Sequence, residues 1–271
     1  MAERSGLYCE VRPGGSTAVV LLHGQPGTSE DWQWVTPLLD ERYTLILPDR
    51  PGYGRSGEAA TGFAGNAAAL VDLLDRLEVG KVLVVGYSWA GGAALALAAD
   101  HPERVSGLVL VSSVGPDEPT TWADRLLAQP LIGEAAAALT IGGPGWLLRR
   151  PRVQSLATRR LRGRPMDAVT ALVRLSRDGT RMWRSFAVEQ RALIGELPGL
   201  ARGLGAIGVP TAVVHGRADH VVPPEVAEHL AGSIPGATLE LVARVGHLLP
   251  HDRPEEVAAA IEAVAARAGR A

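Results

Sequence analysis

Short apolar runs of strand length alternate along this chain with segments of helical periodicity, and this alternation constrains the fold more than any other feature. Residues 18–22 form an uninterrupted apolar run, whereas residues 66–77 place their leucines on one helical stripe. Repeated strand–helix units predict an α/β fold with a mainly parallel sheet flanked by helices. We expect strands over 18–22, 44–47, 81–86, 105–111, 209–214 and 238–242, and helices over 66–77, 89–100, 224–231 and 254–267. The first dozen residues offer at most one short strand, which predicts an abbreviated leading edge of the sheet.

The alternation breaks between residues 116 and 204, where apolar residues recur at helical spacing and no strand is evident. We therefore predict an α/β core formed by residues 1–115 and 205–271, with a helical cap, or lid, inserted over 116–204. The two parts of the chain also differ in net charge. The cap has 14 Arg against 8 acidic residues, a net charge of +6, whereas the remainder has 13 basic against 21 acidic residues, a net charge of −8. The total of −2 thus conceals a basic cap on an acidic core.

The composition excludes several classes of protein. With 46% hydrophobic and 21% charged residues the chain is neither disordered nor dominated by one sign of charge, so we expect no nucleic-acid partner. A single cysteine, Cys9, excludes an internal disulfide. The uncharged stretch 82–99 approaches the length of a membrane span, but Gly86 divides it into a β-branched run and an Ala-rich run, which indicates a strand, a turn and a buried helix. With no signal peptide evident, we expect a cytoplasmic protein and no membrane partner.

The most specific local pattern is Gly-Tyr-Ser-Trp-Ala-Gly at residues 86–91, placed where a predicted strand gives way to a helix. Small residues on both sides of Ser88 allow a sharp turn that exposes its hydroxyl, the context of a nucleophile elbow. Ala90 stands where glycine is more usual. At the start of the following helix, the backbone amide of Trp89 is a candidate donor to an oxyanion.

A serine hydroxyl requires a base, and the base requires an acid that fixes its tautomer. His247 follows the last predicted strand and is the candidate base, and Asp219 follows the strand before it and is the candidate acid. All three residues fall at the carboxyl ends of strands, where open α/β sheets place their sites. The loop His-Gly-Gln-Pro-Gly at residues 23–27 follows the first core strand, so we assign the backbone amide of Gln25 as the second oxyanion donor, with His23 positioning the loop.

With these motifs the chain resembles the α/β-hydrolase superfamily over essentially its whole length apart from the cap. The resemblance rests on the His-Gly-x-Pro loop, the segment Asp-Arg-Pro-Gly-Tyr-Gly-Arg-Ser at 49–56, the elbow, and the motifs around Asp219 and His247. It implies the α/β-hydrolase fold and the triad in the order Ser, Asp, His. The Ser-Trp pair at residues 88–89 is similar to the pair at the elbow of proline iminopeptidases. The His-Gly-x-Pro loop is similar to epoxide hydrolases and haloalkane dehalogenases, but these use Asp as nucleophile, so Ser88 argues against their reactions.

Six of the twelve aromatic residues are tryptophans, and they gather near the elbow and in the cap. We predict that Trp89 and one or more of the cap residues Trp122, Trp146 and Trp183 wall an apolar substrate pocket. The cap also carries seven arginines between residues 149 and 164 without interleaved aromatics. A solvated helix face explains them better than nucleic-acid binding, and a narrower hypothesis is attraction of an anionic or carrier-bound small-molecule substrate.

The sequence therefore predicts a serine hydrolase, without metal or cofactor, that cleaves a moderately apolar ester, lactone or thioester. One alternative is an aminopeptidase or amidase of the proline iminopeptidase type, in which Glu134, Glu189 or Glu196 would bind the amine. A second is a C–C bond hydrolase or a biosynthetic acyltransferase or cyclase, since one triad supports all of these reactions. A third is a non-catalytic binding module. The oligomeric state stays open.

Overall fold

A computed structural model of the chain describes residues 6–39, 41–160 and 182–270. These residues form a seven-stranded sheet with the strand order β1-β3-β2-β4-β5-β6-β7, in which β1 runs antiparallel to β3 and the remaining pairs are parallel. The strands are β1 (Cys9–Arg12), β2 (Thr17–Leu22), β3 (Tyr43–Pro48), β4 (Val82–Tyr87), β5 (Val105–Val111), β6 (Thr211–Gly216) and β7 (Thr238–Val242). The predicted α/β fold with a mainly parallel sheet is thereby confirmed.

Strand β4 occupies the middle of the sheet, between β2 and β5. Its register sets Gly86 opposite Leu22 of β2, and Tyr87 opposite Val111 of β5. All six residues of β4 are buried, as expected for a parallel strand covered on both faces. The residue that follows β4, Ser88, therefore lies at the centre of the carboxyl edge of the sheet.

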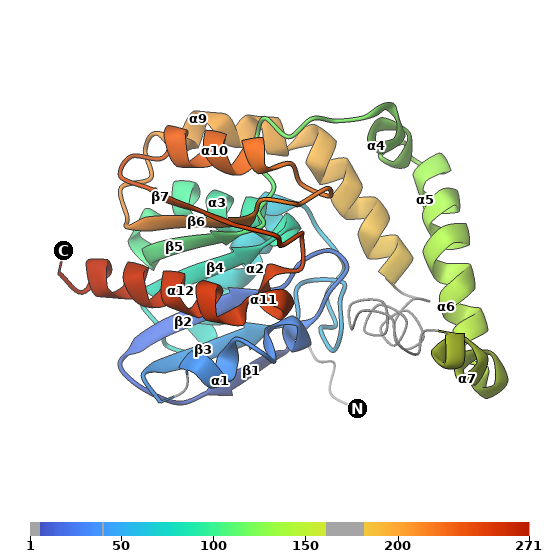
Figure 1. The fold of residues 1–271 in the computed structure, drawn as a ribbon, viewed down its shortest axis with the longest axis horizontal. Coiled ribbons are helices and arrows are strands. Elements are labelled where there is room, and N and C mark those ends of the chain that lie inside the picture. Colours follow the sequence, from blue (N-terminus) through green and yellow to red (C-terminus); the bar gives the residue numbers. More distant parts are fainter. Residues whose placement is uncertain (1–5, 40, 161–181, 271) are drawn as a thin grey trace.

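Helices cover both faces of the sheet (Figure 1). Helices α2, α3 and α10 pack into one apolar cluster, and α1 and α12 pack into the other. Their bounds are α1 (Thr36–Leu39), α2 (Phe63–Arg76), α3 (Trp89–Asp100), α10 (Pro224–Ser233) and α12 (Pro254–Ala268). Helix α2 begins three residues before the predicted start because the Glu196 carboxylate accepts hydrogen bonds from the free backbone amides of Phe63 (2.8 Å) and Ala64 (3.3 Å).

Between β5 and β6 the described residues contain helices and no strand. Helices α4 to α7 form an arm beside the sheet, and a helix over residues 182–195 leads back to it (Figure 1). The elements of this segment are α4 (Trp122–Leu127), α5 (Ile132–Ala137), η3 (Ala138–Gly142), α6 (Gly143–Leu148), α7 (Pro151–Arg160), η4 (Leu197–Leu200) and α9 (Ala201–Leu204). The arm contacts the returning helix through an ion pair of 3.3 Å between Glu134 and Arg191.

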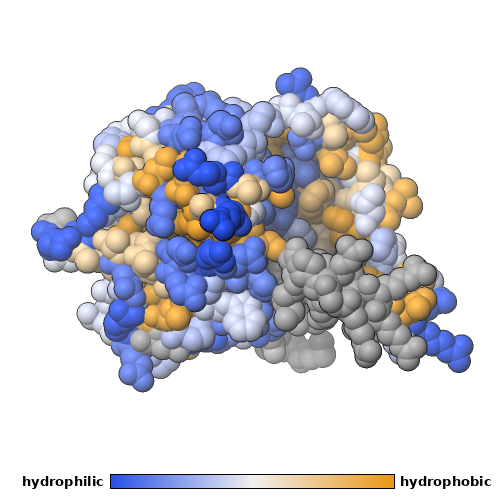
Figure 2. Space-filling view, viewed as in Figure 1, coloured by the Kyte–Doolittle hydropathy of each residue, from blue (hydrophilic) through white to orange (hydrophobic). Residues whose placement is uncertain are grey.

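The arm exposes large apolar side chains, and Figure 2 shows apolar residues gathered at the surface over α4 and α5. The exposed residues of the arm include Trp122, Leu131, Leu139 and Trp146. Of the arginines in the predicted basic face, those at 162 and 164 lie outside the described residues. Among the described helices, none combines the length and apolar character required to cross a membrane.

Candidate active site

Ser88 lies in a sharp turn between β4 and α3. Its backbone has φ 55° and ψ −124°, a conformation that side-chain-bearing residues rarely adopt and that concentrates at functional sites. The turn requires a small residue before it, since a Cβ on Gly86 would lie 2.7 Å from the carbonyl oxygen of Ala90. Hydrogen bonds fix the strained residue on both sides: its amide donates to Val111 (2.9 Å), and its carbonyl accepts from Val114 (3.2 Å). The Ser88 side chain is thereby held at the carboxyl edge of the sheet.

The structure brings Ser88, His247 and Asp219 together in one hydrogen-bonded chain. The Nε2 atom of His247 lies 2.8 Å from the Oγ of Ser88, and its Nδ1 lies 2.8 Å from the Oδ2 of Asp219. Both distances are those of good hydrogen bonds, although the residues come from three separate loops. One imidazole can therefore accept a proton from the hydroxyl while its other nitrogen donates to the carboxylate.

Asp219 is held as a carboxylate by its surroundings. Burial alone would raise its pKa, but hydrogen bonds from His215 and His247 and from the amide of Val222 outweigh burial and lower the pKa below the usual range. Its Oδ1 accepts from the amides of Val221 (2.8 Å) and Val222 (3.0 Å), whereas its Oδ2 faces His247 (2.8 Å) and His215 (3.2 Å). Such a carboxylate stabilises an imidazolium formed beside it.

The residues proposed to supply the oxyanion donors both border the same cavity as Ser88. Among the described residues, no hydrogen bond is assigned to the backbone amide of Gln25 or of Trp89. The side chain of Gln25 donates to the carbonyl of Phe186, 3.3 Å away, which ties the Gln25 loop to the 182–195 helix. Two unengaged amides that flank a nucleophile are the feature required to stabilise an oxyanion.

The cavity has a volume of about 430 Å³ and lies between the sheet edge and the returning helix. Its size is that of a small-molecule site. Apolar side chains from residues 186–197 and from the loops after β5 and β6 form much of its wall, together with several polar groups. The lining comprises Gln25, Ser88, Trp89, Val114, Glu118, Pro119, Thr120, Asp124, Phe186, Gln190, Leu193, Ile194, Leu197, Val221, Val222 and His247.

Of the four predicted pocket tryptophans, only Trp89 is among the described residues that line this cavity. Trp122 is 78% exposed and Trp146 is 56% exposed, because both project outward from the arm. The ring of Trp146 stacks under Arg150, and that of Trp183 under Arg184. The structure therefore places Trp122, Trp146 and Trp183 away from the cavity wall. Their shared location in the cap did not reveal which way each ring points.

The three glutamates considered as amine ligands are also engaged elsewhere and do not line the cavity. Glu134 pairs with Arg191, Glu196 caps α2, and Glu189 forms a buried ion pair with Arg50. The acidic residues that do border the cavity are Glu118 and Asp124. No motif marked these two residues, although Glu118 follows the carboxyl end of a core strand, which is a position where sites gather.

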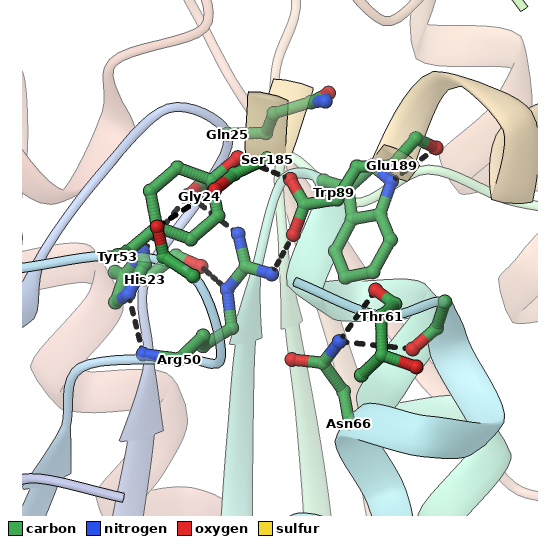
Figure 3. A network of polar contacts seen from close by, with 12 residues as sticks. His23, Gly24, Gln25, Arg50, Tyr53, Thr61, Asn66, Trp89, Ser185 and Glu189 are labelled. Atoms are coloured by element: carbon green, nitrogen blue, oxygen red, sulfur yellow. Dashed lines mark hydrogen bonds and ion pairs between the residues drawn. The ribbon is translucent and has the colours of Figure 1, made fainter. Parts of the chain in front are cut away.

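A buried polar network joins the 182–195 helix to the Gln25 loop and to Trp89 (Figure 3). The Arg50 guanidinium contacts Glu189 and donates to the carbonyls of His23 (2.8 Å) and Gly24 (2.9 Å). It also lies 4.6 Å from the ring centroid of Trp89, whose Nε1 donates to the carbonyl of Glu189. Arg50 thus fixes the loop that carries the Gln25 amide.

The ion pair between Arg50 and Glu189 is closed to solvent, with side chains 1% and 0% exposed. Burial raises the pKa of the Glu189 carboxyl, and the Arg50 guanidinium with the Tyr53 hydroxyl (2.6 Å) offsets part of that rise. The imidazole of His23 accepts from the amide of Arg50 at 2.9 Å, which gives His23 the loop-positioning contact expected of it.

Arg50→Met is expected to lower the free energy of unfolding by about 3–5 kcal/mol, because it leaves the Glu189 carboxylate buried without its cation. Denaturant unfolding at neutral pH measures this loss. The double variant Arg50→Met/Glu189→Leu provides the matched control, since removing both charges should restore most of the stability. Equal stability of the single variant and the parent would show that the pair is not the buried contact described.

Glu118 is a second carboxyl with an altered pKa, and it is half-buried. Burial, with the neighbouring charges of Asp124 and Asp219, raises the pKa of Glu118 from 4.5 to about 7. A raised carboxyl pKa stabilises the fold at low pH, and that contribution is lost as pH rises through the folded-state value. We compare the free energy of unfolding of Glu118→Gln with that of the parent. The variant's value minus the parent's should be higher at pH 8.5 than at pH 4, by up to about 3 kcal/mol.

Unfolding curves of the two proteins at both pH values measure this difference, and the exposed Glu228→Gln substitution serves as the control. A gap between Glu118→Gln and the parent that does not change with pH would contradict the account of Glu118.

Comparison with known proteins agrees with this geometry. The model of the alpha/beta hydrolase fold family matches residues 17–254. A 2-hydroxy-6-oxononadienedioate/2-hydroxy-6-oxononatrienedioate hydrolase of Burkholderia vietnamiensis is 30% identical over 249 residues, covering 86% of this chain and 81% of the relative. An esterase from Exiguobacterium antarcticum (25% identity, TM-score 0.72) covers 97% of this chain and 95% of its own. An N-acyl homoserine lactone degrading enzyme (26% identity, TM-score 0.71) covers 95% and 96%.

Proposed function

The chain belongs to the alpha/beta hydrolase fold family, and from that premise we propose that it is a serine hydrolase acting through an acyl-enzyme on Ser88. The observation that carries the proposal is the pair of 2.8 Å hydrogen bonds that link Ser88 to His247 and His247 to Asp219. A hydrolase of this family requires an activated nucleophile, and this chain of contacts supplies one within a cavity of substrate size.

In the proposed reaction the Ser88 oxygen attacks the substrate carbonyl while His247 takes the hydroxyl proton. The amides of Gln25 and Trp89 donate to the oxygen that becomes negative. His247 then gives its proton to the leaving alcohol or thiol as the carbonyl–heteroatom bond breaks. A water molecule, deprotonated by His247, then attacks the acyl-enzyme. The bond between the acyl carbon and the Ser88 oxygen breaks, His247 gives its proton to that oxygen, and the acid is released.

A moderately apolar ester, lactone or thioester is the proposed substrate class. The apolar part of the cavity wall supports it, and so does the likeness to an esterase and to a lactone-degrading enzyme. A panel of p-nitrophenyl esters, γ- and δ-lactones and acyl thioesters, assayed with the parent and with Ser88→Ala, tests the proposal. Turnover of at least one class that disappears with Ser88 supports it, and turnover that persists in Ser88→Ala contradicts it.

C–C bond hydrolysis is the second candidate, because a relative of this chain is a hydrolase named for a dienedioate substrate. The cavity weighs against a substrate with two carboxylates. Among the described lining residues there is no Arg or Lys, whereas Glu118 and Asp124 are both present. The same lining weighs against an anionic substrate held at the cavity itself. We keep residues 116–204 as the proposed cap, whose 182–195 helix supplies one wall of this cavity.

A further inference from the structure

Two polar side chains border the cavity without a hydrogen-bond partner among the described residues. The Oε2 of Glu118 and the Oε1 of Gln190 are both buried and unpaired, and both residues line the cavity. Gln190 is 8% exposed, so solvent does not compensate its carboxamide. An unpaired buried acceptor costs stability, and such groups in a folded protein call for an explanation.

Three other polar side chains of the wall, those of Asp124, Gln25 and His247, already have partners. The Oδ2 of Asp124 accepts hydrogen bonds from the amide (2.8 Å) and hydroxyl (2.7 Å) of Thr121 at the start of α4. The Gln25 side chain donates to Phe186, and His247 contacts Ser88 and Asp219. Among the described lining residues, the buried side-chain atoms without a partner are therefore those of Glu118, on the loop after β5, and Gln190, on the 182–195 helix.

The placement of Gln190 follows from the periodicity of its helix. Glu189 faces the buried Arg50, so the next residue turns toward the cavity, together with Phe186, Leu193 and Ile194 at spacings of three and four. Gln190 therefore interrupts an otherwise apolar helix stripe. A leucine there would fill the same wall without an unpaired oxygen, which points to a ligand that satisfies the carboxamide.

The charge at this end of the cavity defines which ligand fits. Among the described residues, the charges that act on Glu118 are the negative ones of Asp124 and Asp219. A group that donates hydrogen bonds would satisfy both unpaired oxygens, and a carboxylate or phosphate on the ligand would be repelled.

We propose that Glu118 and Gln190 form a specificity subsite that binds a hydrogen-bond-donating group of the substrate, an amine or a hydroxyl. The subsite deepens the proposed function, on which it rests: the reactive carbonyl lies at Ser88, and the donor group of the same molecule lies against Glu118 and Gln190. The preferred substrates are then amino- or hydroxy-substituted esters, lactones or thioesters.

The test compares three p-nitrophenyl esters of matched length: heptanoate, 6-hydroxyhexanoate and 6-aminohexanoate. For the parent we expect kcat/KM for at least one donor-bearing ester to exceed that for heptanoate by about tenfold or more. Glu118→Leu and Gln190→Leu should each reduce that ratio, and Glu118→Leu should bring it to one or below. Glu118→Gln distinguishes the two donors, because it retains an acceptor for a hydroxyl but loses the charge that favours an ammonium.

Glu134→Leu is the matched control, since it removes a cap carboxylate that does not line the cavity, and the ratio should stay at the parent value. An equal ratio in the parent, Glu118→Leu and Gln190→Leu would overturn the subsite while leaving the serine hydrolase intact. If no ester, lactone or thioester of the substrate panel is turned over, the proposed function fails instead. The subsite is then tested by calorimetry, which measures the binding of methyl 6-aminohexanoate, methyl 6-hydroxyhexanoate and methyl heptanoate to the parent and to Glu118→Leu. Equal affinities of the parent for the three esters would overturn the subsite.

Discussion

Replacing Ser88 with alanine is expected to lower kcat by at least about 10⁴-fold, with the unfolding transition unchanged. The side-chain oxygen is the only non-hydrogen atom removed. The backbone turn that positions it is held by a hydrogen bond donated by the Ser88 amide and by one accepted by its carbonyl, and both remain. The oxyanion donors and the cavity remain, so a small residual rate over the uncatalysed reaction should persist. Steady-state kinetics on the best substrate of the ester panel, together with thermal unfolding, measures both effects.

Ser112→Ala is the matched control for this experiment. Ser112 is a buried serine at the end of the neighbouring strand β5, and like Ser88 it has a positive φ, of 44°. Its side chain does not line the cavity. Activity within a few-fold of the parent is expected for Ser112→Ala. Comparable losses in both variants would mean that the effect of Ser88→Ala is structural rather than chemical.

Asp219→Asn is expected to lower kcat by about 10⁴-fold near neutral pH. The carboxylate accepts from Nδ1 of His247 at 2.8 Å, which directs Nε2 toward the Ser88 hydroxyl as a proton acceptor. A carboxamide does not stabilise the imidazolium, and its amino group can stabilise the wrong tautomer. The exposed pair of His251 and Asp252, 2.9 Å apart, supplies the control: Asp252→Asn removes the same kind of contact away from the cavity and should leave kcat unchanged.

The pH profile gives Asp219 a further test. Because hydrogen bonds lower the pKa of Asp219, its carboxyl stays ionised across the range from about pH 5 to 9. Any acid limb of kcat/KM in this range therefore reports a group other than Asp219. The pH at the midpoint of this acid limb should stay the same when a slower substrate is used. A midpoint that follows the rate constant would instead indicate a change of rate-limiting step.

The sheet and the three residues of the hydrogen-bonded chain could be predicted because each depends on local signals. Apolar runs fix where the strands lie, and parallel strands place their carboxyl ends along one edge. Ser88, Asp219 and His247 each follow such a run, so their proximity follows from topology. The unusual φ of Ser88 agrees with the small residues around it, since Gly86 has no space for a Cβ.

The cavity wall could not be predicted in this way, because it depends on how the 182–195 helix packs against the edge of the sheet. Arg50 lies in a motif visible in the sequence, but its partner Glu189 is 139 residues away on a helix whose rotation no local pattern specifies. The same rotation turns Gln190 into the cavity. Conversely, Trp122 is among the residues predicted to line the pocket, yet its side chain is 78% exposed. Helical periodicity predicted that residues 116–204 are helical, but it did not predict which side of each helix faces the sheet.

Covalent labelling tests the proposed mechanism most directly. The parent enzyme is incubated with a fluorophosphonate, and its intact mass and peptide map are then recorded. The account predicts one adduct per chain, on Ser88, with no adduct in Ser88→Ala and much slower labelling in His247→Ala. An adduct on another residue, or labelling that is as fast in Ser88→Ala as in the parent, would contradict the assignment of Ser88 as the nucleophile.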